Sequence, residues 1–341
     1  MKKTLIASAI AAISFSGVAL AQDSNMPTVY GNIQLAVSYD AVKDGPSSID
    51  HFDNGSTLGV KHDHMIAPGI TGFFKAELEF NADDKAGNGG LDSFDEAYIG
   101  VKGDSFGQIW VGSDDSTYER AVDEISNFWE VATLNLGGGY DTGEGDLVQY
   151  MTPSFGGLTL GAAVQVNGDN KSGGKSYPYQ LSAVYAVDAL ELAFAMDSND
   201  GASAYSKTFD LADSDTQSIN NENTYGVRAS YNLDNLRLTG QVQTRKDYAD
   251  TYGLMGVYTL GQNQFALSYE VREKDGTFKT GEDTTNTIAI QALRNLSDNL
   301  YVYAEGYIGG GDNVYEYEDS NGNDASSDER TVAAVGATYY F

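Results

Sequence analysis

The chain contains no cysteine and only 5 prolines among its 341 residues. Without cysteine no disulfide can hold the fold together, so an exported chain of this length needs another source of stability. After residue 21, no apolar stretch approaches the roughly 20 residues that a membrane-spanning helix requires. If the mature chain crosses a membrane, it does so as a β-barrel, a closed sheet that has no free edge.

Residues 1–21 have the features of a cleaved signal peptide. Two lysines precede an apolar stretch over residues 5–20, and Ala19-Leu20-Ala21 forms an A-x-A cleavage site. Serine and glycine residues interrupt the apolar stretch, which argues against the alternative of an N-terminal transmembrane helix. The sequence therefore predicts export, with a single mature domain spanning residues 22–341.

Positive charge is scarce. The chain has 20 Lys and Arg against 49 Asp and Glu, and loss of Lys2 and Lys3 with the signal peptide takes the net charge from −29 to −31. Nucleic acid and anionic membrane surfaces are poor partners for such a chain. The 39 glycines, 23 tyrosines and 14 phenylalanines suit tight turns and aromatic-rich strands instead.

Apolar and polar residues alternate with a period of two along most of the chain. Leu236, Leu238 and Val242, for example, alternate with Arg237 and polar neighbours, as expected for strands with one apolar and one polar face. Each such run is about as long as a membrane-crossing strand. The pattern predicts sixteen strands, at 28–40, 55–65, 69–81, 92–103, 106–113, 146–153, 157–167, 177–187, 190–199, 223–233, 235–248, 251–260, 263–274, 283–296, 298–310 and 329–341.

The connections alternate between tight turns and long polar, acidic loops. The long loops are expected at residues 40–55, 113–146, 168–176, 199–222 and 311–328. Short turns on one rim and long loops on the other are typical of an outer-membrane barrel, so the fold class is an all-β, transmembrane antiparallel β-barrel. A secreted sandwich or solenoid is the alternative, but it does not explain polar faces rich in Gln, Lys, Arg and Glu opposite uniformly apolar faces. The lumen of a sixteen-stranded barrel is too wide for side chains to fill, so it holds water and conducts.

Short segments along the whole mature chain resemble Gram-negative general-diffusion porins of the trimeric, sixteen-stranded type. The segments that carry the resemblance are Val29-Tyr30-Gly31-Asn32-Ile33, Ser56-Thr57-Leu58-Gly59-Val60-Lys61, Ala97-Tyr98-Ile99-Gly100-Val101-Lys102-Gly103, Val148-Gln149-Tyr150-Met151-Thr152-Pro153-Ser154-Phe155 and the C-terminal strand. The resemblance implies a homotrimer in the Gram-negative outer membrane, surrounded by lipids and lipopolysaccharide. It also implies that barrel-insertion machinery recognises the C-terminal strand, which ends at Phe341.

The loop at residues 113–146 is where function is expected to concentrate, since loops of this length are usually functional or disordered. Ser116 and Glu119 form a capping box, which predicts a short helix at the start of the loop. Apolar side chains follow at helical spacing on one face, at Tyr118, Val122, Ile125 and Trp129. An acidic stripe on the other face contains Glu119, Asp123 and Glu130. The resemblance implies that this third loop folds into the barrel as a constriction; the alternative is an external loop with a solvated acidic face.

The barrel wall departs from the pattern of the resembled family. Thr57, Ser113 and Gln149 occupy three positions where these porins commonly have arginine, which predicts a pore that prefers cations. By strand parity Lys61, Lys75, Glu77 and Glu79 point into the lumen, and Arg228, Arg237, Arg245 and Arg272 are further basic candidates. The candidate pore-lining residues are therefore Lys61, Lys75, Glu77, Glu79, Glu119, Asp123, Glu130, Gln149, Arg228 and Arg237. Packing at the rim or at a subunit interface is the alternative for each charged wall residue.

No motif predicts catalysis, a cofactor or a tight metal site. His62 and His64 could share a metal, but the sequence specifies no third ligand. Acidic stretches near residues 197–201 and 319–324 lack the terminal Glu of a calcium loop, so at most loose divalent-cation binding is expected. A barrel lipase would need a serine inside the barrel beside one of only 3 histidines.

The predicted function is passive diffusion of ions and small hydrophilic solutes across the outer membrane. A substrate-selective channel, for example for sugars, is the main alternative, and a barrel that serves as an adhesin or enzyme is the third. Phe73, Trp110, Tyr118 and Trp129 could form an aromatic track for a sugar, although Tyr and Trp are equally expected at the membrane interfaces.

Overall fold

The computed structural model describes residues 26–83, 91–166, 177–201, 221–275, 284–319 and 321–341. The predicted signal peptide and most of the long loops expected at 168–176 and 199–222 lie outside these residues. No helix in the described part of the chain is long and apolar enough to span a membrane.

Within the described residues the chain forms seventeen strand segments, one α-helix and one 3₁₀ helix. The strands are β1 Thr28–Val42, β2 Ser47–Asp53, β3 Thr57–Ala67, β4 Ile70–Phe80, β5 Leu91–Gly103, β6 Gly107–Ser113, β7 Leu147–Met151, β8 Leu158–Gln165, β9 Tyr179–Val187, β10 Leu190–Asp197, β11 Thr224–Leu233, β12 Leu236–Arg245, β13 Ala249–Leu260, β14 Asn263–Lys274, β15 Thr284–Asn295, β16 Leu300–Glu318 and β17 Asp324–Tyr340. The helices are α1 Thr117–Val122 and η1 Ser126–Phe128.

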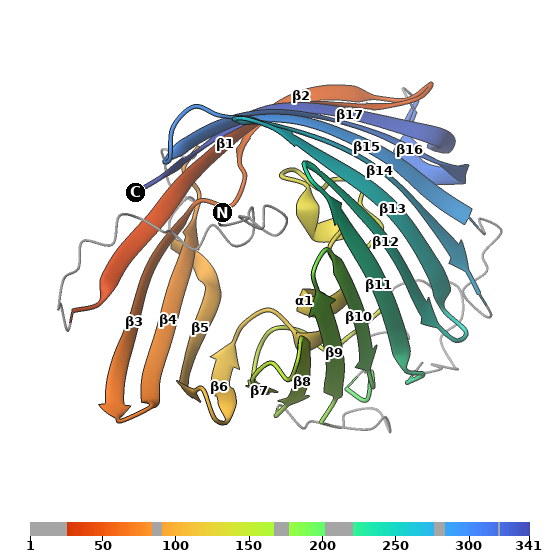
Figure 1. The fold of residues 1–341 in the computed structure, drawn as a ribbon. Coiled ribbons are helices and arrows are strands. Elements are labelled where there is room, and N and C mark those ends of the chain that lie inside the picture. Colours follow the sequence, from red (N-terminus) through yellow and green to blue (C-terminus); the bar gives the residue numbers. More distant parts are fainter. Residues whose placement is uncertain (1–25, 84–90, 167–176, 202–220, 276–283, 320) are drawn as a thin grey trace.

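The strands close into a barrel (Figure 1). From β3 to β17 each strand pairs antiparallel with the next, and β17 pairs with β1 from Asn32↔Tyr340 to Val42↔Arg330. On its other edge β1 pairs with β3 through residues 28–32 and with β2 through residues 35–41. Because β2 and β3 share one position beside β1, the seventeen segments make a sixteen-stranded barrel, which confirms the predicted strand number.

The predicted alternation of faces is present in the wall. On β11 the side chains of Tyr225, Val227 and Tyr231 are exposed on the outside, whereas Arg228 and Ser230 on the same strand are buried on the inside. A barrel whose exposed outer face is apolar and whose inner face is polar is suited to a lipid environment around a wet lumen.

Tight turns connect several pairs of strands, between the ranges that the sequence predicts for those strands. Two-residue connections at 188–189, 234–235 and 261–262 join β9 to β10, β11 to β12 and β13 to β14. Each begins with a residue of positive φ, which two-residue hairpin turns require: Asp188 at 50°, Asp234 at 48° and Gly261 at 61°.

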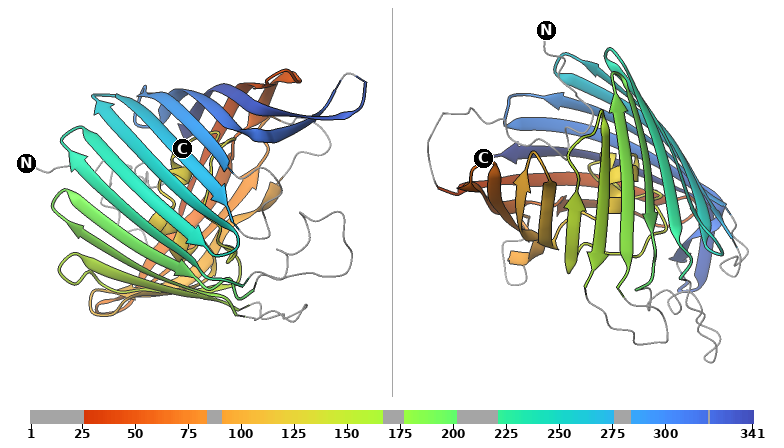
Figure 2. Two further views of the ribbon diagram at one scale, coloured as in Figure 1. Left: turned by 90° about the vertical axis from the view of Figure 1, so that its right-hand side faces the viewer. Right: turned by 60° about the horizontal axis from the view of Figure 1, so that its bottom comes forward.

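Two of the predicted long loops are wrong. Most of residues 40–55 and 311–328 form paired strands, because β1 continues to Val42 and pairs with β2, and β16 and β17 continue past the barrel to Glu318 and Asp324. These segments extend beyond the neighbouring strands (Figure 2), so their side chains are largely exposed. Side-chain contacts support their backbone pairing, such as the hydrogen bond of 3.1 Å that Tyr317 Oη donates to Asp44 O. The polar composition of these segments therefore indicated correctly that they are exposed to solvent, but it indicated wrongly that they are loops.

Candidate functional site

The connection from β6 to β7, residues 114–146, lies inside the barrel, and we call it the inner loop. In Figure 1 the helix α1 occupies the interior of the ring of strands, and it contacts β8, β9, β10 and β11. The loop enters through the predicted cap, in which Ser116 Oγ accepts a hydrogen bond of 3.2 Å from the backbone N–H of Glu119. The described structure therefore has the short helix that the sequence predicts, although it ends at Val122.

The apolar side of the inner loop packs against the wall. Tyr118, Val122, Ile125 and Trp129 are all buried, as their spacing predicts. Glycines in the wall make room for them: a Cβ on Gly226 would lie 2.5 Å from Tyr118 Oη and 2.8 Å from Val122 Cγ1. A side chain at that position would push the helix into the channel.

A ladder of inward-facing glutamines hydrogen-bonds the loop. Gln180 Oε1 accepts from the backbone N–H of Tyr118 at 2.9 Å, Gln241 Oε1 accepts from that of Ile125 at 3.2 Å, and Gln243 Oε1 accepts from Tyr118 Oη at 2.9 Å. The Nε2 of Gln243 donates to Asp123. Asp123 is only 3% exposed, so its predicted place on a solvent-facing acidic stripe is wrong: the helix ends before this residue and turns its carboxylate toward the wall.

The second half of the loop is tied to β16. Glu305 accepts hydrogen bonds from the backbone N–H groups of Glu130 and Val131 at 2.9 and 3.0 Å. The carboxylate of Glu130 accepts from Tyr301 Oη at 2.9 Å and so points to the wall rather than across the channel. Burial raises the pKa of Glu130 to about 7, an effect that the hydrogen bond from Tyr301 opposes and the negative charge of Glu305 increases.

The arginines of the wall do point inward, but the inner loop covers them. Arg228 and Arg237 bind Glu124, and they are 5% and 7% exposed rather than open to the channel. Arg245 pairs with Asp141 of the loop at 2.8 Å, and Arg272 donates to the backbone oxygen of Gly137.

The wall formed by β3, β4 and β5 carries the predicted inward lysines and glutamates. Lys75 pairs with Glu96 and lies 3.6 Å from Glu77, while the ammonium of Lys61 lies 4.8 Å from the ring centroid of Tyr30. Lys75 is thus matched by more than one carboxylate.

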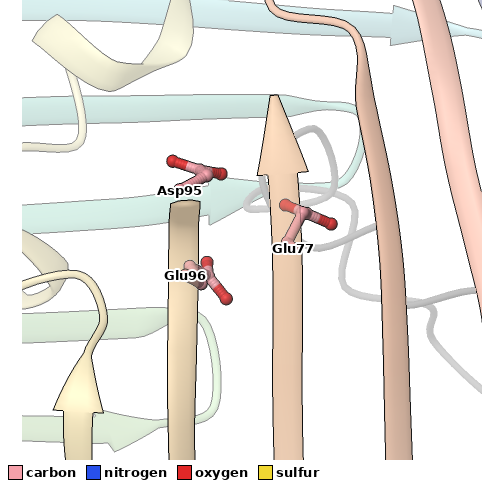
Figure 3. Close-up of side chains that lie close together, drawn as sticks. All are labelled: Glu77, Asp95 and Glu96. Atoms are coloured by element: carbon pink, nitrogen blue, oxygen red, sulfur yellow. The ribbon is translucent and has the colours of Figure 1, made fainter. Parts of the chain in front are cut away.

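Three carboxylates gather at this wall (Figure 3). Oxygens of Glu77, Asp95 and Glu96 lie within 4.8 Å of one another. Asp95 and Glu96 are not among the residues predicted to line the pore, and strict alternation would send these two neighbours to opposite faces. The pairing runs from Glu77↔Glu96 to Leu78↔Phe94, which leaves Asp95 unpaired in a β-bulge, and a bulge breaks the two-residue period.

The free face of the inner loop carries a second acidic group. Carboxylate oxygens of Asp115, Glu119 and Glu144 lie within 4.8 Å of one another. Burial raises the pKa of Glu119 to about 7; the charge of Asp115 adds to this and a hydrogen bond from Asn127 opposes it. Burial also raises the pKa of Glu144, together with the charges of Asp115, Asp114 and then Glu79 on β4. The charge of Glu79 acts on Glu144, which is consistent with one acidic space between the loop and the β4 wall.

Gln149 does not line the channel. It is 1% exposed, and its side-chain oxygen accepts from Thr117 Oγ1 at 2.8 Å and from Arg120 Nη2 at 2.7 Å. Arg120 also pairs with Asp114 at 2.7 Å. Gln149 therefore supports the base of the loop, and an arginine there would meet Arg120 instead of the lumen.

A closed barrel with a polar interior and an inner loop is the architecture of a channel. A family model described as Gram-negative porin matches residues 7–313. The chain belongs to this family.

The porin is also similar to individual known proteins and to solved structures. It is 28% identical over 397 aligned positions, covering 100% of both chains, to a protein named monosaccharide porin from Halomonas sp., and equally to the major outer membrane protein of Halomonas elongata. Its fold matches the solved structure of an anion-selective porin from Comamonas acidovorans with a TM-score of 0.68 at 16% identity, over 93% of this chain and 99% of that one. The porin is therefore an outer-membrane channel of Gram-negative bacteria and not an enzyme, as the sequence predicts.

Proposed function

We propose that the porin lets ions and small hydrophilic solutes diffuse across the outer membrane and that it prefers cations. The observation that carries this proposal is the charge around the space between the inner loop and the β3–β5 wall. Among the residues that the structure describes, the basic groups around this space are Lys61, Lys75 and Arg120. The carboxylates around it are eight, those of Glu77, Glu79, Asp95, Glu96, Asp114, Asp115, Glu119 and Glu144.

The balance of charge is what favours cations. Lys75 and Arg120 are each paired with a carboxylate, and the inward arginines on the opposite side lie under the loop. A channel lined by one sign of charge concentrates counter-ions, so cations should accumulate here and anions should be depleted. Five of the predicted pore-lining residues do not contribute to this field directly, because they face the wall or lie under the inner loop: Asp123, Glu130, Gln149, Arg228 and Arg237.

Neutralising the free face of the loop tests the proposal. Glu119→Gln with Glu144→Gln should move the zero-current potential in a potassium chloride gradient toward the anion value, because two carboxylates leave the narrow acidic space. Glu318→Gln makes the same kind of change on the exposed end of β16 and should leave the potential unchanged. Equal shifts in both proteins would contradict the assignment of the selectivity to the inner loop.

A sugar-selective channel is the second candidate, because one relative is named a monosaccharide porin. The aromatic residues that could form a track for a sugar do not support it: Trp110, Tyr118 and Trp129 are 4%, 0% and 5% exposed. Single-channel current with and without added glucose separates the two functions. Saturable block by the sugar would favour a binding site, whereas an unchanged current apart from the viscosity effect would favour general diffusion.

We also propose that the porin assembles as a homotrimer in a membrane containing lipopolysaccharide, and that insertion machinery recognises its last strand. The family and the apolar outer face support this proposal. Phe341 itself is 50% exposed on the outside, where a partner protein can reach it.

A further inference from the structure

Glu124 lies where the inner loop meets β11 and β12, and it is saturated with hydrogen bonds. Its carboxylate accepts from Arg237 Nε and Nη2 at 2.7 and 2.6 Å, from Thr239 Oγ1 at 2.7 Å, from Ser230 Oγ at 3.1 Å and from Arg228 Nη1. This is the bidentate geometry in which arginine binds carboxylates most strongly.

The two arginines are balanced by two carboxylates. Glu191 on β10 lies 2.6 Å from Arg228 and 3.5 Å from Arg237, so with Glu124 the four groups sum to zero charge. The side chains of Arg228 and Arg237 are only 6% and 8% exposed, against 30% for Glu191. The side chain of Glu124 is 19% exposed, and of the two carboxylates it is the one that belongs to the loop lying over the arginines.

The positive charge under the loop is permanent. Guanidinium groups do not lose their proton in proteins, so Arg228 and Arg237 stay charged at any pH used for transport. Although burial raises the pKa of Glu124, the hydrogen bond from Arg237 and the charge of Arg228 outweigh it and hold the pKa below the ordinary range. Glu124 hence stays ionised where Glu119, on the free face of the same loop, takes up a proton.

We propose that Glu124 determines ion selectivity from behind the inner loop, by holding Arg228 and Arg237 against the wall and keeping their two charges out of the channel. The proposal rests on the proposed cation preference. Without the carboxylate the loop loses its charged tether at this point, and the side of the lumen formed by β11 and β12 turns from neutral to basic. The wall formed by β11 and β12 thus carries positive charges that would attract anions, and Glu124 of the inner loop keeps these charges from the channel.

The test is a cycle of four proteins: wild type, Glu124→Gln, the pair Arg228→Gln with Arg237→Gln, and all three changes together. The readout is the cation-to-anion permeability ratio in a potassium chloride gradient. Glu124→Gln should lower the ratio at least several-fold, because one unit charge at roughly 4 Å in water changes the local concentration of a monovalent ion about fivefold, in opposite directions for cations and anions. In the background without the two arginines the same change should have a clearly smaller effect, because nothing basic remains to be uncovered.

Equal effects of Glu124→Gln in both backgrounds would overturn the proposal, since Glu124 would then act as a simple lumen charge. So would an unchanged ratio in folded Glu124→Gln protein, with folding checked by heat-modifiable gel migration. If Glu124→Gln does not fold, Glu124→Asp replaces it: the charge is kept but the shorter side chain cannot span both arginines, so a lower ratio supports the proposal and an unchanged ratio contradicts it. Anion preference of the wild type would defeat the proposed function, yet the coupling would still be read from the same cycle.

Discussion

Single carboxylates of the inner loop differ in how they respond to pH. The pKa values of Glu119 and Glu130 are raised to about 7 by burial, whereas arginines hold that of Glu124 low. Between about pH 5 and pH 8 the porin should therefore gain negative charge on the loop while the pairing under it stays the same. A change of pH in this range should accordingly alter the ion selectivity without breaking the ion pairs that attach the loop to the wall.

Cation preference should rise as pH increases from 5 to 8, because Glu119 is neutral below its pKa of about 7 and negative above it. Asp115 and Glu144 face Glu119 and increase the effect through their own charges. Reversal potentials at the two pH values measure it, and the step should shrink in Glu119→Gln. A preference that did not change with pH would show that Glu119 is not in the conducting space.

The same raised pKa values of Glu119 and Glu130 make the folding stability of the porin decrease as pH rises. Glu119 and Glu130 bind protons more tightly in the folded porin than at their ordinary pKa of 4.5, so their contribution to folding stability is lost as pH rises from about 4.5 to about 7. Glu130→Gln should remove part of this loss and raise the unfolding temperature at pH 8 more than at pH 5. The opposite order would mean that Glu130 is stabilised as a carboxylate.

At the scale of elements, the inner loop is held by two different attachments. Glu124 fixes its first half to β11 and β12, and Glu305 fixes its second half to β16 through two backbone N–H groups. Glu305→Ala leaves these half-buried donors without an acceptor, which costs up to about 1–3 kcal/mol, the range for fully buried groups. Single-channel recordings of this variant should show more open-channel noise, while Glu318→Ala on the same strand should not. Identical noise in both would mean that apolar packing alone holds the loop.

The sequence predicts the regular elements well and the loop attachments poorly. Strict alternation locates the strands, and the capping box at Ser116 locates the helix. The rule fails at Asp95, where a bulge places neighbouring acids together, and at residues 311–328, where polar strands extend past the barrel. It also cannot show that Glu124 meets arginines more than 100 residues away, because that contact depends on where the loop lies inside the barrel.

At the scale of the whole molecule, the last residue forms the end of the seam that closes the barrel. The backbone N–H of Phe341 donates to Gly31 O at 3.0 Å, and Gly31 donates back to Phe341 O at 3.2 Å. A Cβ on Gly31 would lie 2.7 Å from the Phe341 ring, so the ring packs directly on the first strand. The seam between β1 and β17 thus ends in this one contact.

Deleting Phe341 should therefore prevent efficient closure and insertion, leaving protein that does not show heat-modifiable migration on a gel. Phe341→Tyr keeps the ring and both backbone hydrogen bonds and should insert normally. Full yields of heat-modifiable protein after the deletion would contradict a role for the terminal residue in assembly.

Ion selectivity is a property of the whole lumen, and one measurement tests it most directly: the zero-current potential of the wild-type porin in a potassium chloride gradient, at pH 8 and at two salt levels. Around 0.1 M salt, where screening extends over about 10 Å, the potential should have the sign of a clear cation preference. Near 1 M, where screening acts within about 3 Å, the preference should be much smaller. A potential of the opposite sign at low salt would contradict the proposal that the acidic space beside the inner loop selects the ions.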